Sequence, residues 1–290
     1  MHALPPANVD RRQFLKSAAA GATGLCCGAM PLRGLTAEEP ADPYRGFKMG
    51  FQSYSLRGFD VKKALATTHA LGIRYWETFP GHIKAGTLPK YIAEQKELLA
   101  ANGVTLLAFG VVGFDANESK AREVFDFAKL MGIQSLSADP QKNEATFKLL
   151  DKLVDEYGVN IAIHNHGPKA SYDKIADVVQ WVKDRHPRIG ACVDTGHYLR
   201  SRENPVEALE RLKDRVFGVH LKDVKDATVF KILGEGDLDL AGCLKVLQQM
   251  QYKYCLALEY EENPTNPVPD IEICLQNVRK AIQALPPAQG

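Results

Sequence analysis

Residues 189–223, IGACVDTGHYLRSRENPVEALERLKDRVFGVHLKD, contain one complete strand–helix–strand unit. A β-rich run at Ile189–Asp194 precedes a helical segment, and a second β-rich run follows at Val216–Asp223. Between them, Asn204-Pro205 supplies an N-cap followed by a proline at the first helical position, where its missing N–H costs nothing. This order is typical of a βαβ crossover between parallel strands.

The same unit recurs along the chain about every 30 residues, which is the spacing of βαβ units. Glycines at 72, 103, 132 and 158 stand where a helix must stop before the next strand. Eight β-rich runs in strict alternation with helices predict an α/β fold, a single closed (β/α)₈ TIM barrel. The six further runs are Met49–Leu56, Arg74–Phe79, Thr105–Val112, Gln134–Asp139, Asn160–His166 and Cys255–Glu261, and the other predicted helix N-caps are Asp60, Asn117, Asn143 and Ser171.

A doubly wound open sheet is the alternative fold. It would require a glycine-rich phosphate loop after the first strand, and Arg57-Gly58-Phe59-Asp60 is not one. A second glycine-containing segment, Gly234–Asp239, is too short for a nucleotide loop and lacks a following Lys-Ser/Thr. It is either a βα loop near the barrel rim or a plain turn.

Charge and hydropathy exclude several classes of partner. The 36 basic and 35 acidic side chains leave a net charge of +1, which offers no footprint for nucleic acid or an anionic membrane. No apolar run is long enough to span a bilayer. The composition is compatible with a homo-oligomer.

The N-terminal region differs from the rest of the chain. Arg11 and Arg12 precede Phe-Leu-Lys and a mildly apolar, Gly/Ala-rich stretch from Ser17 to Met30, a pattern that resembles a twin-arginine signal. Cleavage after Ala37 would remove it. The predicted organisation is therefore a signal peptide at 1–37, a flexible tail at 38–45 and the barrel at 46–285. The expected partner is the twin-arginine export machinery, and the expected location is periplasmic or otherwise extracytoplasmic.

Four cysteines follow the predicted signal. Their wide spacing is not that of a disulfide-dense domain, so we expect buried thiols at Cys192, Cys243, Cys255 and Cys274.

Unusual polarity gathers at the predicted strand ends, which is where such barrels carry their chemistry. Carboxylates and imidazoles in buried parallel strands are costly unless they are paired or bind metal. Because side chains alternate along a strand, His164 shares a face with His166, His220 with Lys222, and Glu259 with Glu261. Singly, each residue could be structural, but together they predict a divalent metal site. The complete set of strand-end residues is Glu77, His164, His166, Asp194, His197, His220, Lys222, Glu259 and Glu261.

These motifs resemble those of the xylose isomerase-like TIM-barrel superfamily, the sugar phosphate isomerases and epimerases, over residues 45–285. The resemblance implies that Asp194, His220 and Glu259 bind the metal. The fourth ligand falls on His164, where relatives carry a glutamate. Mn²⁺ is the favoured ion, with Co²⁺, Zn²⁺ or Mg²⁺ as alternatives. The carrying segments are Val193–His197, Val219–Asp223, Gly234–Asp239 and Leu258–Glu261.

The resemblance implies a sugar isomerase or epimerase that removes a proton next to a carbonyl and proceeds through an enediolate. It therefore implies a small-molecule carbohydrate as the expected partner. Glu259 can serve as one acid/base group, while the opposing glutamate of relatives is missing. Glu77, His166 and His197 are candidates for the second group. His197, Lys222 and Glu261 are candidates for binding substrate hydroxyls.

Three other functions remain as alternatives. A metal-dependent lyase that eliminates a group from 3-keto-glycosides would use the same proton abstraction. A non-catalytic sugar-binding barrel would need no base beside the metal. Incision of DNA at abasic sites is disfavoured, because the third strand end (Gly110-Val111-Val112) lacks a histidine and the charge is near neutral.

Overall fold

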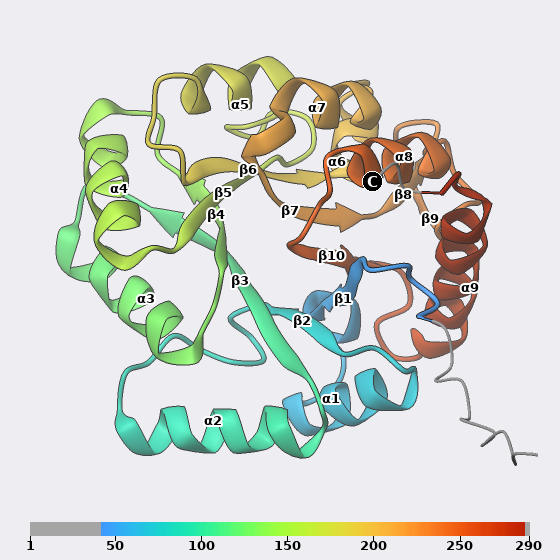
Figure 1. The fold of residues 1–290 in the computed structure, drawn as a ribbon, viewed down its shortest axis with the longest axis horizontal. Helices are drawn as coiled ribbons and strands as arrows, with labels where there is room; N and C mark the ends of the chain where they lie inside the picture. The colour runs from blue at the N-terminus through green and yellow to red at the C-terminus, as the bar shows by residue number, and fades with distance from the viewer. Residues whose placement is uncertain (1–41, 288–290) are drawn as a thin grey trace, which may run out of the picture. The chain divides into compact units, whose positions relative to one another are not determined.

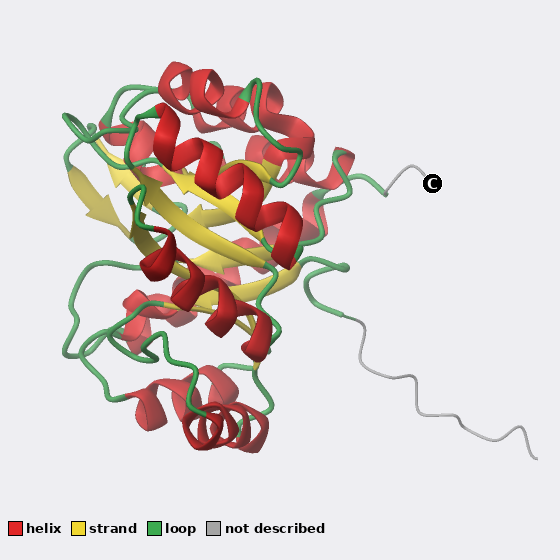
Figure 2. Cartoon of the chain, turned by 90° about the vertical axis from the view of Figure 1, so that its left-hand side faces the viewer, coloured by secondary structure: helices red, strands yellow, loops and turns green. Residues whose placement is uncertain are grey.

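In the computed structural model, which describes residues 42–287, eight parallel strands close into a barrel in the order β1-β10-β7-β6-β5-β4-β3-β2. Figures 1 and 2 show the strands inside and the helices around them. Every neighbouring pair in the barrel is parallel, which confirms the predicted TIM barrel. The strands are β1 (Lys48–Gln52), β2 (Tyr75–Thr78), β3 (Thr105–Phe114), β4 (Ser135–Pro140), β5 (Asn160–His164), β6 (Ile189–Asp194), β7 (Val216–Leu221) and β10 (Cys255–Leu258).

The helices between the strands begin mostly at the predicted caps. Asp60, Asn117 and Asn143 each accept a hydrogen bond from a backbone N–H in the first turn, and Asn204 accepts from Val206 N. The helices are α1 (Val61–Ala70), α2 (Pro89–Ala101), α3 (Glu118–Met131), α4 (Glu144–Tyr157), α5 (Ile175–Val182), α6 (Thr195–Arg200), α7 (Pro205–Leu212), α8 (Leu240–Gln249) and α9 (Val268–Ala284), with 3₁₀ turns η1 (Ser53–Leu56) and η2 (Lys213–Arg215).

One predicted cap is wrong. Ser171 does not begin a helix, because α5 starts at Ile175 with Lys174 at its N-cap position. Tyr172 explains the delay, since its side chain is buried and its hydroxyl donates to Pro140 O at 2.8 Å. The chain therefore turns inward at this point before the helix can begin.

Two helices end in left-handed glycines. Gly132 follows α3 with φ 75°, and Gly158 follows α4 with φ 70°. A side chain would be strained in this conformation, so glycine is the residue that lets the chain turn into the next strand.

Several predicted strands end earlier than expected, at the barrel rim. The run to Leu56 is strand only as far as Gln52, and the run to Glu261 is strand only as far as Leu258. Ser55 joins the two ends, because its Oγ donates to Leu258 O and accepts from Tyr260 N. Past the rim the backbone leaves the ladder and carries its side chains over the barrel mouth.

The connection after β7 contains a hairpin that the sequence pattern did not predict. Strand β8 (Asp223–Lys225) pairs antiparallel with β9 (Val229–Lys231). Its turn holds Asp226 and Ala227 at positive φ, a conformation for which alanine has no preference. Three-residue strands are also too short to show a periodic pattern.

Gly234–Asp239 belongs to the same βα connection and folds around a buried carboxylate. The Asp223 carboxylate accepts hydrogen bonds from the backbone N–H of Gly234, Gly236 and Leu238 at 2.8–3.0 Å. Asp239 then caps α8 by accepting from Gly242 N. The segment is thus a βα loop, as one of the two interpretations predicted.

The first described residues pack against the last helix. Arg45 donates to Ile282 O, Leu285 O and Pro286 O at 2.8–3.1 Å, and Tyr44 is buried. Residues 42–45 are therefore anchored, although the sequence assigned them to a flexible tail. The predicted signal at 1–37 lies outside the described residues.

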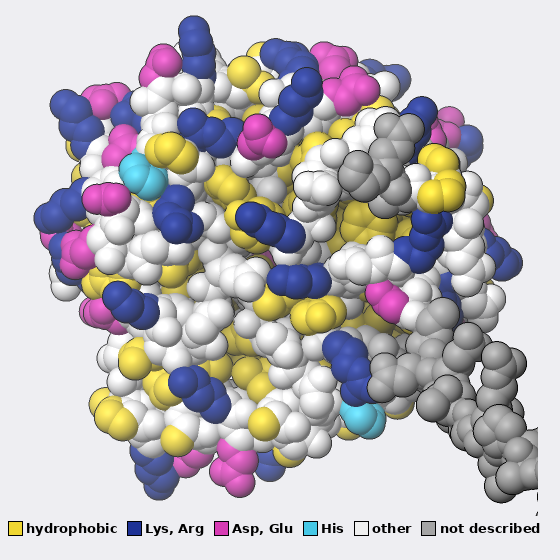
Figure 3. Space-filling view, viewed as in Figure 1, with side chains coloured by type: hydrophobic (Ala, Val, Ile, Leu, Met, Phe, Trp, Pro, Cys, Tyr) yellow, Lys and Arg dark blue, Asp and Glu magenta, His cyan; other side chains and the backbone are white. Residues whose placement is uncertain are grey.

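The barrel has a mixed-charge surface. The face seen in Figure 3 carries both lysine or arginine and aspartate or glutamate side chains, with the acidic ones mostly near its edge. None of the described helices is both long and apolar enough to cross a membrane.

Candidate active site

Four polar side chains converge from neighbouring barrel strands. His164 is the last residue of β5, Asp194 the last of β6, His220 lies in β7, and Glu259 follows β10 directly. One ligand atom from each of them lies within 4.8 Å of all the others. The sequence-predicted ligand set is thus brought together at one end of the barrel.

The distances within this cluster suit a shared cation. His220 Nδ1 lies 3.0 Å from His164 Nε2 and 3.0 Å from Glu259 Oε2, and His164 Nε2 lies 3.4 Å from Asp194 Oδ2. Asp194 Oδ2 and Glu259 Oε2 are buried and accept no well-directed hydrogen bond among the described residues, although the Lys222 ammonium lies beside both. Two imidazole nitrogens and two carboxylate oxygens fit a borderline divalent metal.

The two oxygens of Asp194 face different partners. Oδ1 accepts from His197 N at 2.8 Å and caps α6. Oδ2 faces the cluster. The Asn165 side chain holds the same backbone from behind, donating to Asp194 O at 2.9 Å and accepting from Asp194 N at 2.8 Å. One carboxylate therefore both caps α6 and faces the ligand cluster.

Lys222 supplies a positive charge beside the cluster. Its Nζ lies 2.9 Å from Asp194 Oδ2 and 3.0 Å from Glu259 Oε2, and it also pairs with Glu261. Burial opposes ionisation of these groups, yet His197 and Lys222 hold the pKa of Asp194 well below its usual value. Burial likewise opposes the charge on Glu259, but Lys222 and His220 lower its pKa to about 2. Both carboxylates are thus ionised at neutral pH.

Glu77 lies on the other side of His220 from the cluster's ligand atoms. Its Oε2 is 2.9 Å from His220 Nε2, whereas His220 Nδ1 faces Glu259. Gln52 donates to Glu77 Oε1 at 3.0 Å. Glu77 is fully buried and does not line the cavity, so its place in the structure is that of a support for His220 and not of an acid/base group on the substrate.

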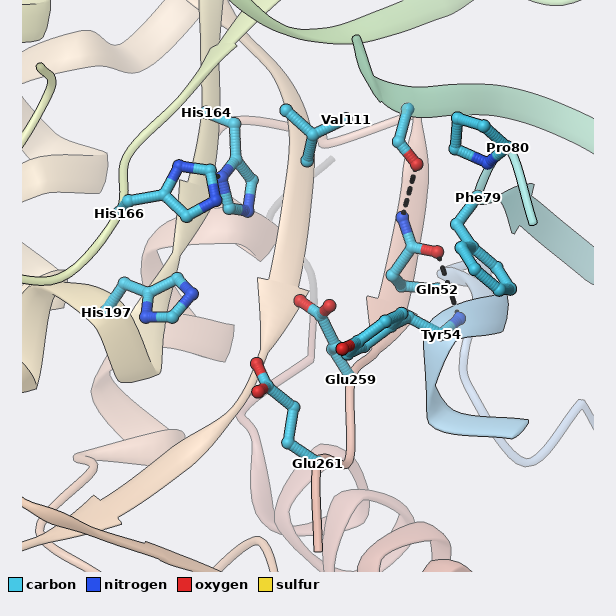
Figure 4. Close-up of a pocket in the computed structure, with 11 residues that line it drawn as sticks. Gln52, Tyr54, Phe79, Pro80, Val111, His164, His166, His197, Glu259 and Glu261 are labelled. Atoms are coloured by element: carbon cyan, nitrogen blue, oxygen red, sulfur yellow. Dashed lines mark hydrogen bonds between the residues drawn. The ribbon is translucent and has the colours of Figure 1, made fainter. Parts of the chain in front are cut away.

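A cavity of about 380 Å³ opens over the cluster, within the range of roughly 300–1,000 Å³ that small-molecule sites occupy. Figure 4 shows three imidazoles on one side, Tyr54 and Phe79 on the other, and the two glutamates between them. The lining residues are Gln52, Tyr54, Phe79, Pro80, Gly110, Val111, His164, His166, His197, Glu259 and Glu261.

Two of the imidazoles are uncharged at neutral pH. Burial, helped by the charge of His164, lowers the pKa of His166 to about 4. Burial also lowers the pKa of His197 to about 3, although Asp194 opposes the shift. His166 Nδ1 faces His164 Nδ1 at 3.4 Å, and His197 Nε2 lies 3.3 Å from Lys222 Nζ.

The structure brings eight of the nine sequence-predicted residues to or directly beneath the cavity, and places Glu77 behind His220. Sequence reasoning missed the opposite wall, Gln52, Tyr54 and Phe79. Gln52 ends β1, so a polar residue at the end of the first strand was an available signal. Tyr54 and Phe79 lie beyond strand ends, where an aromatic residue cannot be told from ordinary packing.

Comparison with known proteins identifies the family of the chain. The family model "Xylose isomerase-like TIM barrel" matches residues 65–280. The chain belongs to the xylose isomerase-like TIM-barrel family. Its similarity to an inosose dehydratase of Clostridium perfringens is 24% identity over 260 residues, covering 82% of each chain.

Two solved structures of low sequence identity share the fold. A D-tagatose 3-epimerase-like protein superposes with a TM-score of 0.64 at 18% identity, over 82% of this chain and 98% of the other. A "probable 3-DHS dehydratase" from Bacillus anthracis superposes with a TM-score of 0.66 at 12% identity, over 80% and 99%. Epimerases and dehydratases are thus both represented on this barrel.

Proposed function

We propose that this protein is a divalent-metal-dependent lyase that removes a proton next to the carbonyl of a cyclic polyol ketone and eliminates a β-oxygen substituent. The observation that carries the proposal is the position of Glu259. This side chain lines the cavity and also places one oxygen in the ligand cluster, opposite the imidazoles of His166 and His197.

His164, Asp194, His220 and Glu259 would hold the metal. Such an ion supplies Lewis-acid stabilisation of the negative charge that develops on a carbonyl oxygen when the adjacent proton leaves. Lys222 keeps Asp194 and Glu259 ionised and thus ready to bind a cation.

His166 is the group that we assign to proton transfer. It lines the cavity, and its Nδ1 faces His164, which leaves Nε2 for a ligand. A neutral imidazole can take the proton from carbon and return it to the departing oxygen. The C–H and C–O bonds break, a C=C bond forms in conjugation with the carbonyl, and water or an alcohol leaves.

The cavity favours an uncharged substrate. No lysine or arginine lines it within residues 42–287, and the nearby Lys222 is already paired with three carboxylates. A phosphate would therefore find no free lysine or arginine side chain in the cavity lining. Tyr54 and Phe79, packed edge to face, offer an apolar wall to the C–H face of a sugar or cyclitol ring. Inososes and 3-keto-glycosides fit this description, and the inosose dehydratase relatives support elimination.

An isomerase or epimerase is the second candidate. The observation that favours it is the presence of acid/base groups on different sides of the cavity, with Glu259 and Glu261 facing His166 and His197 (Figure 4). Return of the proton to the opposite face of the carbon would then replace elimination.

Deuterium exchange tests both candidates. The chain from about residue 38, loaded with Mn²⁺, is incubated in D₂O with inososes, 3-keto-glycosides and ketoses. Loss of substrate with a new conjugated-enone absorbance indicates elimination, and a deuterated epimer seen by NMR indicates epimerisation. Glu259→Gln and Asp194→Ala should abolish both. Retained metal without exchange on any compound would reject catalysis and support a sugar-binding barrel.

A further inference from the structure

We propose that Glu77 is a positioning residue that fixes His220 with Nε2 protonated, so that Nδ1 keeps a free lone pair for the metal cluster. The inference rests on the metal-binding part of the proposed function and does not depend on the reaction that follows. Two backbone groups beside Gln52 have hydrogen-bonding roles that cannot change.

Those two backbone groups orient the amide of Gln52. Tyr54 N donates to Gln52 Oε1 at 3.2 Å, and Gln52 Nε2 donates to Gly110 O at 3.3 Å. A backbone N–H can only donate and a carbonyl can only accept, so the Gln52 amide cannot be turned round without losing both bonds. The amide group of Gln52 therefore presents a donor to Glu77.

Because Gln52 presents an N–H donor, residue 77 must provide a hydrogen-bond acceptor toward it. Glu77 Oε1 accepts from Gln52 Nε2 at 3.0 Å, and Glu77 Oε2 lies 2.9 Å from His220 Nε2. A carboxylate offers two acceptors, so Nε2 of His220 must carry the hydrogen. His220 Nδ1 is then available to the cluster, where it lies 3.0 Å from both His164 Nε2 and Glu259 Oε2.

Burying the Glu77 carboxylate beside His220 is energetically unfavourable unless the carboxylate is fully hydrogen-bonded. Glu77 and His220 are both completely buried, and an ionised carboxylate in such surroundings is tolerated only when its hydrogen bonds are satisfied. Carboxylates behind metal-binding imidazoles typically orient the ring and raise its basicity, and their loss costs roughly 10–100-fold in metal affinity.

Glutamine at position 77 provides a sharp test. In Glu77→Gln, the single acceptor oxygen of the amide must face Gln52. The amide NH₂ then faces His220 and can donate only to an unprotonated Nε2. The proton then moves to Nδ1, where it blocks the metal. In Glu77→Ala the space can admit water, which can still accept from Nε2–H. If Glu77 positions His220, Glu77→Gln should therefore lose more metal affinity than Glu77→Ala. A purely packing role predicts the reverse, because glutamine is closer in shape to glutamate.

Metal affinity is measured by chelator competition with Mn²⁺ and with Zn²⁺ at fixed pH. We expect Glu77→Gln to bind at least about tenfold more weakly than the wild type, and more weakly than Glu77→Ala. The matched control, Glu156→Gln, removes a carboxylate that pairs with Arg122 on the surface, and it should bind like the wild type. Circular dichroism of each metal-free variant establishes that it is folded.

A tautomer measurement separates positioning from altered stability. In the Zn²⁺-loaded wild type labelled with ¹⁵N-histidine, we expect His220 to show a protonated Nε2 and a coordinated Nδ1. Wild-type affinity in folded Glu77→Gln, or a greater loss in Glu77→Ala than in Glu77→Gln, would overturn the inference, as would a wild type that binds neither ion. Weak binding by Glu77→Gln together with no exchange in D₂O by the wild type would uphold the inference while rejecting the proposed lyase.

Discussion

At the residue scale, Asp194 combines a structural and a ligand role in one carboxylate. Oδ1 caps α6, and Oδ2 lies in the ligand cluster. We expect Asp194→Asn to keep the cap but lose metal binding, and Asp194→Ala to lose both. Loss of an N-cap costs about 1 kcal/mol, so Asp194→Ala should be less stable than Asp194→Asn by that amount in metal-free urea denaturation.

Chelator competition supplies the second measurement on the same pair. Both Asp194 variants should bind Mn²⁺ far more weakly than the wild type. Equal stability of the two variants would show that the cap adds nothing, and wild-type affinity in Asp194→Asn would show that Oδ2 is not a ligand.

The four cysteines of the described residues behave as the sequence predicted, as buried free thiols. Burial raises the pKa of Cys243 and of Cys274 to about 12, and it raises those of Cys192 and Cys255 as well. The thiolate is the reactive form, so almost none is present at pH 8. In the chain from residue 38, we expect no reaction with a thiol reagent at pH 8 until a denaturant is added, and then reaction of all four. Rapid labelling of the native protein would contradict the prediction.

At the element scale, the alternation of barrel strands and helices could be predicted from the sequence. Apolar runs, asparagine and aspartate caps and left-handed glycines are local signals, and each of them acts within a few residues. The ends of the strands were less readable. Ser55 joins the ends of β1 and β10 through hydrogen bonds to residues about two hundred positions away in the sequence. No local pattern encodes such a contact.

The candidate site likewise contains residues that the sequence could predict and residues that it could not. Residues within motifs, such as Asp194 and His220, were predictable because a polar or charged side chain in a buried strand is costly unless it is paired or binds metal. The role of Glu77 was not, because its partner His220 lies 143 positions away and the barrel closure alone brings the two together. The aromatic wall of Tyr54 and Phe79 was invisible for a similar reason, since it depends on loops from two strands.

The connection after β7 depends on Asp223. Its buried carboxylate accepts three backbone N–H groups of the 234–238 segment and one from Val224. We expect Asp223→Ala to lower the free energy of unfolding by about 3 kcal/mol, because several buried donors lose a charged acceptor at once.

Urea denaturation gives the free energy, and hydrogen exchange should show faster exchange at Gly234, Gly236 and Leu238. The control is Asp214→Ala, which changes an exposed aspartate and should stay within about 0.5 kcal/mol of the wild type. A stable Asp223→Ala protein with unchanged exchange would mean that the loop is held by other contacts.

At the scale of the whole molecule, the ligand cluster is enclosed by the folded barrel. Asp194 and His220 are fully buried, and His164 is only 2% exposed. The ligands come from four separate strands, so the complete site exists only in the folded barrel. The compartment in which the chain folds is therefore the first in which the site can bind a metal.

We propose that the barrel folds in the cytoplasm and is then exported by the twin-arginine route, which carries folded proteins. The Arg11-Arg12 pair ahead of an apolar stretch is the feature that supports this. In a bacterial host with this pathway, we expect the processed protein in the periplasmic fraction. Replacing both arginines with lysine should leave the precursor in the cytoplasm, while Arg33→Lys, outside the pair, should not. Equal export of the two variants would remove the twin-arginine assignment, and with it the reason to expect a metal loaded before export.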